Sequence, residues 1–360
     1  MSTDLPGALA ACEKKVSAYI LDERFRNQFR PEQLREAVFA YLERPGKRLR
    51  PAVLLWSCGA VGGDEETALP AAAAVEVFHT WTLVHDDLID NDDLRRGGPT
   101  VHKFGEIIAK QRMKFDEKSS EEYGRDLAIL TGDAQHGFTI SLLCECSRTG
   151  KVDADVIVDI IRHLESHVVN TLIEGEILDV EYSFKSVEQL TENDIIRMLW
   201  MKTGALYEFA ARTGAMIGLN CRNAEHPWIA SLSRFASKCG TAFQLQDDIL
   251  GIIGDEAQLG KPVGSDIREG KKTIIVYRAF SKASREQQQF LRSVIGNPRA
   301  PIEEIRQATQ LMVELGAVED TAQIAREYID AAVSELSTVP DSNYKQLLAA
   351  WARYMIERKF

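Results

Sequence analysis

Apolar residues recur at steps of three and four along most of this chain of 360 residues, and this period limits what the chain can fold into. The segments that show the period are rich in Ala, Leu, Ile, Glu and Arg: residues 65–95, 127–148, 153–183, 192–219, 227–252, 302–315, 319–337 and 342–358. No alternation of apolar and polar residues is sustained over the length of a strand. The sequence therefore predicts an all-α fold.

Glycine and proline interrupt these segments at turns, such as Pro45-Gly46 and Gly97-Gly98-Pro99, but no linker divides the chain. The length exceeds that of a typical domain, although large helical folds reach it as one domain. We therefore expect a single domain over residues 1–360. Residues 107–126 are polar and mixed in charge, which predicts an exposed excursion that is partly helical or mobile.

The charge balance argues against one class of partner. The chain has 54 acidic and 43 basic residues and a net charge of −11, whereas nucleic acid is bound through a basic surface. We expect no nucleic-acid partner. The surplus acid is either solvated surface or is concentrated where it holds a divalent metal, and composition leaves both open.

Cysteine usage and hydropathy indicate the cellular compartment of the protein. The six cysteines form no CxxC pair and have no histidine at zinc spacing, so they are expected to be reduced thiols in a cytoplasmic protein. The first residues lack the basic-then-apolar order of a signal peptide, and no run of 18 apolar residues occurs. We expect no transmembrane segment.

Carboxylates gather at the end of the first predicted helix. Asp86, Asp87 and Asp90 occupy positions i, i+1 and i+4, so Asp86 and Asp90 share one helix face and repel each other. A hard dication relieves that repulsion, and magnesium is typically held by one or two carboxylates together with substrate phosphates. The pattern favours a phosphate ligand bound through metal. The alternative is a solvated acidic helix end.

Basic residues follow the carboxylates, and the order recurs later in the chain. Arg95 and Arg96 come after the first aspartates, and guanidinium groups match phosphate oxygens well, although plain ion pairing would also explain them. The second set, Asp247 and Asp248, precedes Lys261 in the same way. Two such helices facing each other would enclose a cavity with acid at its mouth and apolar walls.

Three further signals are weaker by themselves. GKRLRP at residues 46–51 places basic side chains around a turn, but it is equally an ordinary helix flank. Lys202 lies within an apolar stretch, where a lysine can simply extend to solvent. His79 lies seven residues before Asp86, roughly two helical turns, and a single histidine on an apolar helix is more often a core residue than a ligand.

Five motifs together resemble one family. In order they are GKRLRP, HDDLIDNDDLRRGGPTVH, KTGAL, FQLQDD and GDEAQLGKPVGSDIREGKKT, and they cover about residues 46–272. The chain resembles the trans-isoprenyl diphosphate synthases, the polyprenyl synthetase family, most of all the short-chain geranylgeranyl and farnesyl diphosphate synthases. The resemblance implies a bundle of mostly antiparallel helices around a deep central cavity (the isoprenoid synthase type I fold), and a homodimer. It implies a prenyltransferase that condenses isopentenyl diphosphate with dimethylallyl, geranyl or farnesyl diphosphate.

The resemblance also implies roles for individual residues. Three magnesium ions would be held by Asp86, Asp87, Asp90, Asp247 and Asp248. The allylic diphosphate would be held by Arg95, Lys202 and Lys261. Isopentenyl diphosphate would be held by Lys47, Arg50, His79 and Arg96. The reacting carbons would be flanked by Thr203 and Gln244, and Lys271 would lie near the metals.

One position departs from the family pattern. The second motif is usually DDxxD, but here Gly251 replaces its last aspartate, which removes a carboxylate from the third-metal site. Two alternative functions remain to be compared with this pattern. A class I terpene cyclase would need an NSE-type second metal motif in place of the lysine loop, GKPVGSD, which contains Lys261. A non-catalytic partner subunit would have lost an acidic motif or the Lys/Arg set.

Residues upstream of Asp86 bear on product length, because in the family they form the floor of the chain pocket. Trp81 precedes Asp86 by five residues, about 7.5 Å of helix, with Thr82 beside it and Phe78 one turn deeper. A tryptophan there predicts geranylgeranyl diphosphate (C20), with farnesyl diphosphate (C15) or a longer polyprenyl diphosphate as alternatives. Trp81 could instead face the core, with the limit at Phe138 or across a dimer.

Overall fold

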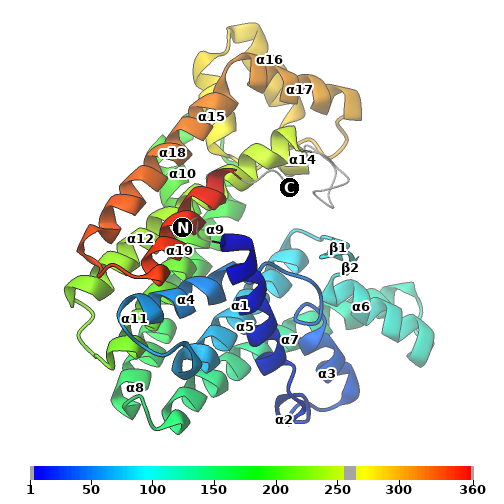
Figure 1. Ribbon diagram of the computed structural model, residues 1–360. Helices are drawn as coiled ribbons and strands as arrows, with labels where there is room; N and C mark the ends of the chain where they lie inside the picture. Colours follow the sequence, from blue (N-terminus) through cyan, green and yellow to red (C-terminus); the bar gives the residue numbers. More distant parts are fainter. Residues whose placement is uncertain (1–3, 255–264, 358–360) are drawn as a thin grey trace. The chain divides into compact units, whose positions relative to one another are not determined.

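The computed structural model describes residues 4–254 and 265–357. Helices make up nearly all of this part (Figure 1), so the prediction of an all-α fold is confirmed. The described residues form two compact units: unit 1 contains residues 4–161, 210–224 and 341–347, and unit 2 contains residues 162–209, 225–254, 265–340 and 348–357. The single domain over residues 1–360 stays a prediction.

Unit 1 contains the N-terminal helices and a small β-hairpin. Its elements are α1 (Leu5–Ile20), α2 (Glu23–Arg26), α3 (Glu32–Phe39), α4 (Leu49–Ala60), α5 (Glu65–Ile89), β1 (Leu94–Arg95), β2 (Gly98–Pro99), α6 (Val101–Ile108), η1 (Ala109–Met113), α7 (Glu117–Glu145) and η2 (Cys146–Thr149). Three helices contribute residues to both units: α8 (Ala154–His163), α11 (Ala205–Leu219) and α19 (Asn343–Glu357).

Unit 2 contains the later helices. Its elements are η3 (Leu164–Val168), α9 (Val169–Phe184), η4 (Val187–Gln189), α10 (Glu192–Leu199), η5 (Trp200–Gly204), α12 (Pro227–Ile253), α14 (Ser265–Glu269), α15 (Ile274–Lys282), α16 (Arg285–Val294), α17 (Ile302–Glu314), α18 (Ala317–Glu335) and η6 (Leu336–Thr338). The predicted segments 153–183 and 192–219 are each one helical run interrupted by a π-helical turn, η3 and η5. Such turns are frequent at functional sites.

Helix α5 carries the first aspartate motif and begins at a clear cap. The side chain of Asp64 accepts a hydrogen bond from the amide of Glu66, and two acidic residues occupy the first turn, where the helix dipole favours negative charge. The four alanines 71–74 are fully buried, and their small side chains let neighbouring helices approach closely. The helix packs against α4 and α7, which places its last turn at a fixed position in unit 1.

The residues after α5 form a tight β-hairpin that orients the two arginines. Leu94 pairs with Pro99 and Arg95 with Gly98, so Arg96 and Gly97 form the two-residue turn. Both have positive φ, at 50° and 74°, as a type I′ hairpin turn requires. Arg95 therefore lies in a strand and Arg96 at the turn. These strands of two residues are too short to be predicted from alternation.

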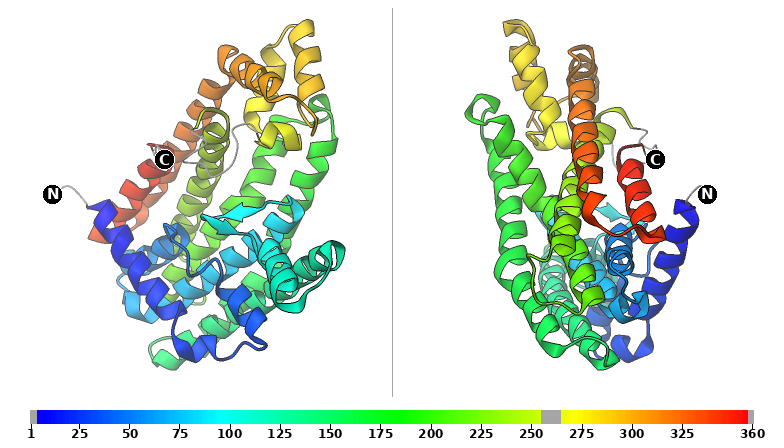
Figure 2. Two further views of the ribbon diagram at one scale, coloured as in Figure 1. Left: turned by 90° about the vertical axis from the view of Figure 1, so that its right-hand side faces the viewer. Right: turned by 60° about the vertical axis from the view of Figure 1, so that its left-hand side comes forward.

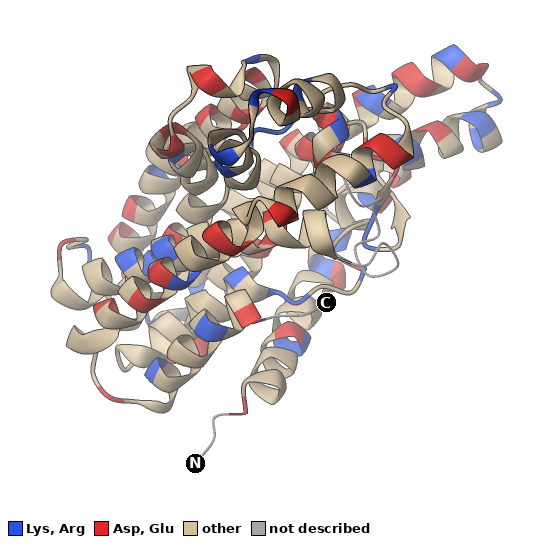
Figure 3. Ribbon diagram, turned by 90° about the horizontal axis from the view of Figure 1, so that it is seen from above, with Lys and Arg blue, Asp and Glu red and all other residues tan. Residues whose placement is uncertain are grey.

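The predicted polar excursion, residues 107–126, is mostly helical. It contains the end of α6, the π-helical turn η1 and the start of α7, and Figure 2 shows α6 and α7 running side by side. Gly105 and Gly124 permit this close contact, because a Cβ atom on Gly105 would lie 2.7 Å from the Cα of Gly124. Acidic and basic residues are interspersed along the helices (Figure 3).

Unit 2 has its own apolar core around α12. Helix α18 packs along α12 (Figure 1), and buried side chains from α12, α15 and α17 form a cluster that includes Ile249, Ile275 and Ala308. Glycines bring η5 close to α12: a Cβ on Gly240 would lie 2.7 Å from the Cα of Gly204. This packing fixes Lys202 and Thr203 beside the second aspartate motif.

In the part of the chain that the structure describes, we find no helix that combines the length and the apolar character needed to cross a membrane.

Candidate functional site

A buried ion pair in unit 1 connects the basic GKRLRP motif to α5. Arg48 is 3% exposed and Glu76 is 1% exposed, and a guanidinium nitrogen of Arg48 donates to Glu76 Oε1. The same oxygen accepts from Arg96 Nη2 at 3.4 Å. One carboxylate therefore holds an arginine from each of two motifs that are far apart in the sequence.

A second contact joins the same motifs. Arg44 donates to the carbonyl oxygens of Arg95 and Pro99 at 2.8 and 2.9 Å, so it holds the β-hairpin against the segment before GKRLRP. Arg96 Nη1 donates to the carbonyl oxygen of Tyr41 at 3.0 Å. The hairpin therefore has a defined position relative to Arg48.

His79 lies among these arginines. Burial lowers the pKa of His79 well below its usual value, and the positive charges of Arg50 and Arg96 lower it further, as do those of Arg95 and Arg48. A histidine in this setting is a neutral hydrogen-bonding group. Of the residues expected to hold isopentenyl diphosphate, the structure thus brings together Arg50, His79 and Arg96, in surroundings of positive charge that suit an anion.

Asp87 is a fully buried carboxylate whose two oxygens are both used by protein donors. Nε of Arg95 donates to its Oδ1 at 2.7 Å, Nη2 of Arg95 donates to the same oxygen, and the hydroxyl of Tyr41 donates to Oδ2. Burial raises the pKa of Asp87, and the hydrogen bonds and charge of Arg95 offset part of this increase. In this geometry Asp87 orients Arg95.

Asp86 and Asp90 differ from Asp87 in exposure. Both are partly exposed, and Asp90 is the C-terminal cap of α5. Nη2 of Arg95 lies 3.7 Å from Asp86 Oδ2, so a cation and a carboxylate already stand side by side. Within residues 4–254 and 265–357, no group of three or more His, Cys, Asp or Glu side chains is arranged to hold a metal ion by itself. This is compatible with magnesium, which typically takes one or two carboxylates together with substrate phosphates.

In unit 2, two predicted lysines converge on a carboxylate that the sequence did not reveal. Nζ of Lys202 and Nζ of Lys271 each lie 2.8 Å from Oδ2 of Asp179, which is 7% exposed. Glu176, one turn earlier on α9, pairs with Lys202 at 2.9 Å. Lys272, the neighbour of Lys271, instead donates to the carbonyl oxygens of Gly270 and Ser183 and is buried.

The residues expected to flank the reacting carbons form a hydrogen-bonded chain. The hydroxyl of Thr203 donates to Gln244 Oε1 at 2.8 Å, and Gln244 Nε2 donates to Asp248 Oδ1 at 3.1 Å. Gln244 and Asp248 are one turn apart on α12, and Thr203 comes from the π-helical turn η5. The structure thus brings together the predicted Thr203, Gln244 and Asp248.

Asp248 provides a test of whether these residues fit a metal ion. It is 6% exposed, and among the described residues its Oδ2 has no hydrogen-bond partner. Burial raises its pKa well above the usual value, and the negative charge of Asp266 adds to this. A buried carboxylate oxygen of this kind, beside further carboxylates, fits a hard dication.

Gly251, the departure in the second motif, leaves space that Asp266 occupies. A Cβ atom on Gly251 would lie 3.1 Å from Asp266 Oδ2. A carboxylate from α14 therefore lies beside the position where the family pattern has its last aspartate. Asp247 is partly exposed on the same helix as Gly251. The predicted Lys261 lies outside the described residues.

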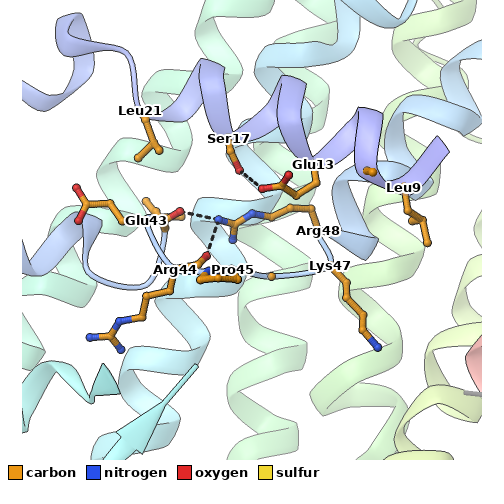
Figure 4. Close-up of a pocket in the computed structure, with 12 residues that line it drawn as sticks. Leu9, Glu13, Ser17, Leu21, Glu43, Arg44, Pro45, Lys47 and Arg48 are labelled. Atoms are coloured by element: carbon orange, nitrogen blue, oxygen red, sulfur yellow. Dashed lines mark hydrogen bonds between the residues drawn. The ribbon is translucent and has the colours of Figure 1, made fainter. Parts of the chain in front are cut away.

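Lys47 is exposed and faces an open groove of about 730 Å³ between α1 and the GKRLRP segment. Leu9 and Glu13 line it on one side and Pro45 on the other. Figure 4 shows Lys47 pointing away from Arg48, which donates to the carbonyl oxygens of residues 42 and 44. Lys47, the fourth predicted ligand of isopentenyl diphosphate, therefore lines this groove.

The residues expected to limit product length form an aromatic cluster between α5 and α7. The Trp81 ring centroid lies 4.7 Å from Phe78, 5.6 Å from His85 and 5.7 Å from His136 of α7. Thr82 donates to the carbonyl oxygen of His79 at 2.7 Å.

Phe138, the alternative position for the limit, is buried in a separate aromatic cluster. Its ring contacts Phe25 and Phe29 at 5.5 and 5.3 Å.

Sequence reasoning missed three polar residues that hold the predicted ones: Tyr41, Glu76 and Asp179. Glu76 carried a usable signal, since it is a charged residue within a run of apolar side chains that predicts a fully buried helix. Asp179 lies among other acidic residues of its helix and carried no such signal.

Comparisons with known proteins agree with the motifs. The sequence model of the polyprenyl synthetase family matches residues 31–312, across both units. A geranylgeranyl diphosphate synthase of Saccharolobus solfataricus is 36% identical over 91% of this chain and 90% of its own length. A geranylfarnesyl diphosphate synthase of Aeropyrum pernix is 33% identical over 91% of this chain and 95% of its own.

A solved structure is also similar. It is the geranylgeranyl pyrophosphate synthase of Corynebacterium glutamicum in complex with isoprenyl diphosphate and magnesium, which is 28% identical, has a TM-score of 0.82 and covers 99% of both chains. The family match and the relatives confirm the resemblance that the five motifs indicate. This chain belongs to the polyprenyl synthetase family of trans-isoprenyl diphosphate synthases.

Proposed function

We propose that the chain is a prenyltransferase that condenses isopentenyl diphosphate with dimethylallyl, geranyl and farnesyl diphosphates, with geranylgeranyl diphosphate as the main product. The observation that carries this proposal is the arrangement of basic side chains beside carboxylates in both units. In unit 1, arginines surround His79 next to the first aspartate motif. In unit 2, Lys202 and Lys271 converge near the second motif.

In the proposed reaction the carbon–oxygen bond of the allylic diphosphate breaks and a carbon–carbon bond forms to isopentenyl diphosphate. A proton then leaves the new chain, and the departing diphosphate accepts it. Thr203 and Gln244, which are hydrogen-bonded to each other, would lie beside the carbons where positive charge develops. Apolar walls would keep water away from that cation.

The chain's residues divide into three groups in this proposal. The allylic diphosphate is held by Arg95, Lys202 and Lys261, with Lys271 near the metal ions. Isopentenyl diphosphate is held by Lys47, Arg50, His79 and Arg96. Three magnesium ions are held by Asp86, Asp90, Asp247 and Asp248, with Asp87 beside them. Bound magnesium would supply positive charge that stabilises the leaving diphosphate.

The C20 product rests on Trp81. Its packing against Phe78 and His136 gives the floor a fixed position, and Phe138 belongs to a different cluster. A shorter C15 product or a longer one is the alternative, and a relative named as a geranylfarnesyl diphosphate synthase favours the longer one. A terpene cyclase fits less well, because the second motif is followed by a lysine loop and lacks the NSE pattern. A non-catalytic subunit fits less well, because the acidic and basic sets are both retained.

We further propose a cytoplasmic homodimer. All six cysteines lie in the described residues and are thiols rather than disulfides, which favours a reducing compartment. Ile173 and Ile177, one turn apart on α9, are 45% and 52% exposed, and a second copy of the chain would cover this apolar surface. Light scattering of the purified protein would test the dimer.

The activity is tested by incubating the protein with labelled isopentenyl diphosphate, magnesium and each allylic diphosphate in turn, then sizing the products with and without EDTA. A dominant C20 product that EDTA removes supports the whole proposal. A magnesium-dependent product of another length would contradict the Trp81 floor alone. The absence of product from every primer would favour the non-catalytic subunit.

A further inference from the structure

Asp179 of α9 binds two lysine side chains at once. Its Oδ2 atom accepts from the ammonium groups of both Lys202 and Lys271, each at 2.8 Å. Because both nitrogens bind one oxygen, they can be at most about 5.6 Å apart, twice that distance. We propose that Asp179 is a positioning residue that holds these two lysines as a convergent pair for the allylic diphosphate. This rests on the proposed function.

The local backbone is built to bring Asp179 to the lysines. Gly175 lies one turn before Asp179 on α9, and a Cβ there would lie 2.6 Å from the backbone nitrogen of Lys202. The glycine thus lets α9 lie directly against η5. Lys271 follows the end of α14, where its amide donates to the carbonyl oxygen of Asp266 at 2.9 Å.

The charges around Asp179 explain why the lysines need such a partner. Two ammonium groups this close repel each other, and both are largely buried, with 24% and 13% of their side chains exposed. Asp179 relieves the repulsion in the free protein. Burial alone would raise the pKa of Asp179, but the charges of Lys202 and Lys271 outweigh it, so its carboxylate stays ionised.

Other charged groups face the same place. Glu176 pairs with Lys202 from α9, and Asp248 of α12 and Asp266 of α14 add negative charge nearby. These acids would draw the lysines in different directions if Asp179 were neutral. An ammonium group has three N–H donors, so a lysine that binds Asp179 is still able to donate to a diphosphate oxygen.

The test compares Asp179→Asn, Asp179→Glu and Glu335→Gln. Glu335 is the matched control: it is also in unit 2 and also binds two basic side chains, Arg234 and Lys238, neither of them a proposed ligand. Thermal unfolding of each variant is measured first. The KM values for the allylic diphosphate and for isopentenyl diphosphate are then determined separately, and binding of inorganic diphosphate with magnesium is measured by calorimetry.

Asp179→Asn is expected to raise the allylic KM and the Kd for inorganic diphosphate by about tenfold or more. The KM for isopentenyl diphosphate should change by less than about twofold. Asp179→Glu should recover part of the loss, and Glu335→Gln should match the wild type. Equal changes in both KM values, or tighter binding of diphosphate by Asp179→Asn, would overturn the proposal. If Asp179→Asn fails to fold, Asp179→Glu alone decides: a larger rise in the allylic KM than in the KM for isopentenyl diphosphate supports the proposal, and equal changes or no change in the two values overturn it.

The two proposals fail in different ways. A wild-type protein that makes no prenyl product, but binds inorganic diphosphate about tenfold more tightly than Asp179→Asn, would contradict the proposed function and support the lysine pair. An active wild type with an unchanged Asp179→Asn variant would contradict only the role of Asp179.

Discussion

Nε and Nη2 of Arg95 both donate to one oxygen of Asp87, a residue eight positions earlier whose side chain is fully buried. The second oxygen of Asp87 accepts from Tyr41. The middle carboxylate of the first motif is therefore part of the protein's own ion-pair network, while Asp86 and Asp90 on either side are partly exposed. This difference in surroundings predicts different consequences of mutation.

Asp87→Ala is expected to destabilise the fold. It leaves the guanidinium of Arg95 and the hydroxyl of Tyr41 without this partner, and breaking a buried ion pair costs about 3–5 kcal/mol. The free energy of unfolding from urea denaturation measures the effect. Asp93→Ala, which removes a 76% exposed carboxylate, is the control and should stay within about 0.5 kcal/mol of wild type. Wild-type stability in Asp87→Ala would show that Asp87 is not structural.

Asp86→Ala is expected to abolish turnover and leave the fold intact. Its carboxylate is 21% exposed, and its loss removes a proposed metal ligand, so product formation should fall by on the order of 10³ or more. Product formation with saturating magnesium is measured beside thermal unfolding. Near-normal activity would be incompatible with the metal assignment.

Trp81→Ala is expected to lengthen the product. Removing the indole opens the space between Phe78 and His136, so the growing chain can pass the former floor. Products are sized by chromatography after reaction from farnesyl diphosphate. Trp81→Phe keeps an aromatic ring and serves as the control, with a product close to that of wild type. An unchanged length in Trp81→Ala would place the limit elsewhere.

Gly251→Asp restores the usual second motif but is expected to destabilise the fold in the absence of metal. The Cβ atom of the new side chain would lie 3.1 Å from Asp266 Oδ2, so its carboxylate would be close to Asp266 and to the buried Asp248, and such repulsion costs about 1–3 kcal/mol. Magnesium should recover most of the loss. Unfolding is measured in EDTA and in magnesium. The variant Gly251→Asn has a side chain of similar size without the charge, so it separates the effect of size from the effect of charge. Equal destabilisation by both variants in both conditions would exclude a charge effect.

The ionisation of Asp179 predicts how the stability of the protein changes at acidic pH. Its pKa is held below the usual value by Lys202 and Lys271, so its contribution to stability is complete above the unfolded-state pKa of about 3.9 and is lost as pH falls through the lower folded-state value. Asp179→Asn should therefore be less stable than wild type by about 2 kcal/mol at pH 7, and this difference should shrink below about pH 4.

Urea denaturation at several pH values measures this difference. Asp330→Asn, which changes an exposed aspartate of α18, is the control and should follow the wild-type curve throughout. A difference between Asp179→Asn and wild type that stays constant down to pH 3 would contradict the prediction.

The helices were predictable, and the aspartate motif of α5 was recognisable, because each depends on local pattern. The period of α5 and the i, i+4 spacing of Asp86 and Asp90 are visible within a few residues of sequence. The partners of the proposed ligands were not predictable in this way. Glu76 binds Arg48 across 28 positions, and Asp179 binds Lys271 across 92, so only the tertiary fold reveals these pairs.

The β-hairpin shows a different limit of prediction from sequence. Its turn at Arg96 and Gly97 is in keeping with the Gly-rich sequence, but strands of two residues leave no period to detect. The hairpin is nevertheless what separates the roles of Arg95, which binds Asp87, and Arg96, which binds Glu76. Neighbouring residues with the same side chain thus acquire different partners.

The left-handed backbone at Arg48 and Arg96 has a consequence for engineering. Both arginines have positive φ, at 45° and 50°, where glycine would be favoured by roughly 1 kcal/mol, and both bind the single carboxylate of Glu76. The chain gives up local stability to keep two guanidinium groups at fixed places. Selection of variants for heat resistance alone would therefore tend to erode this proposed anion-binding surface, whereas selection that also demands turnover would preserve it.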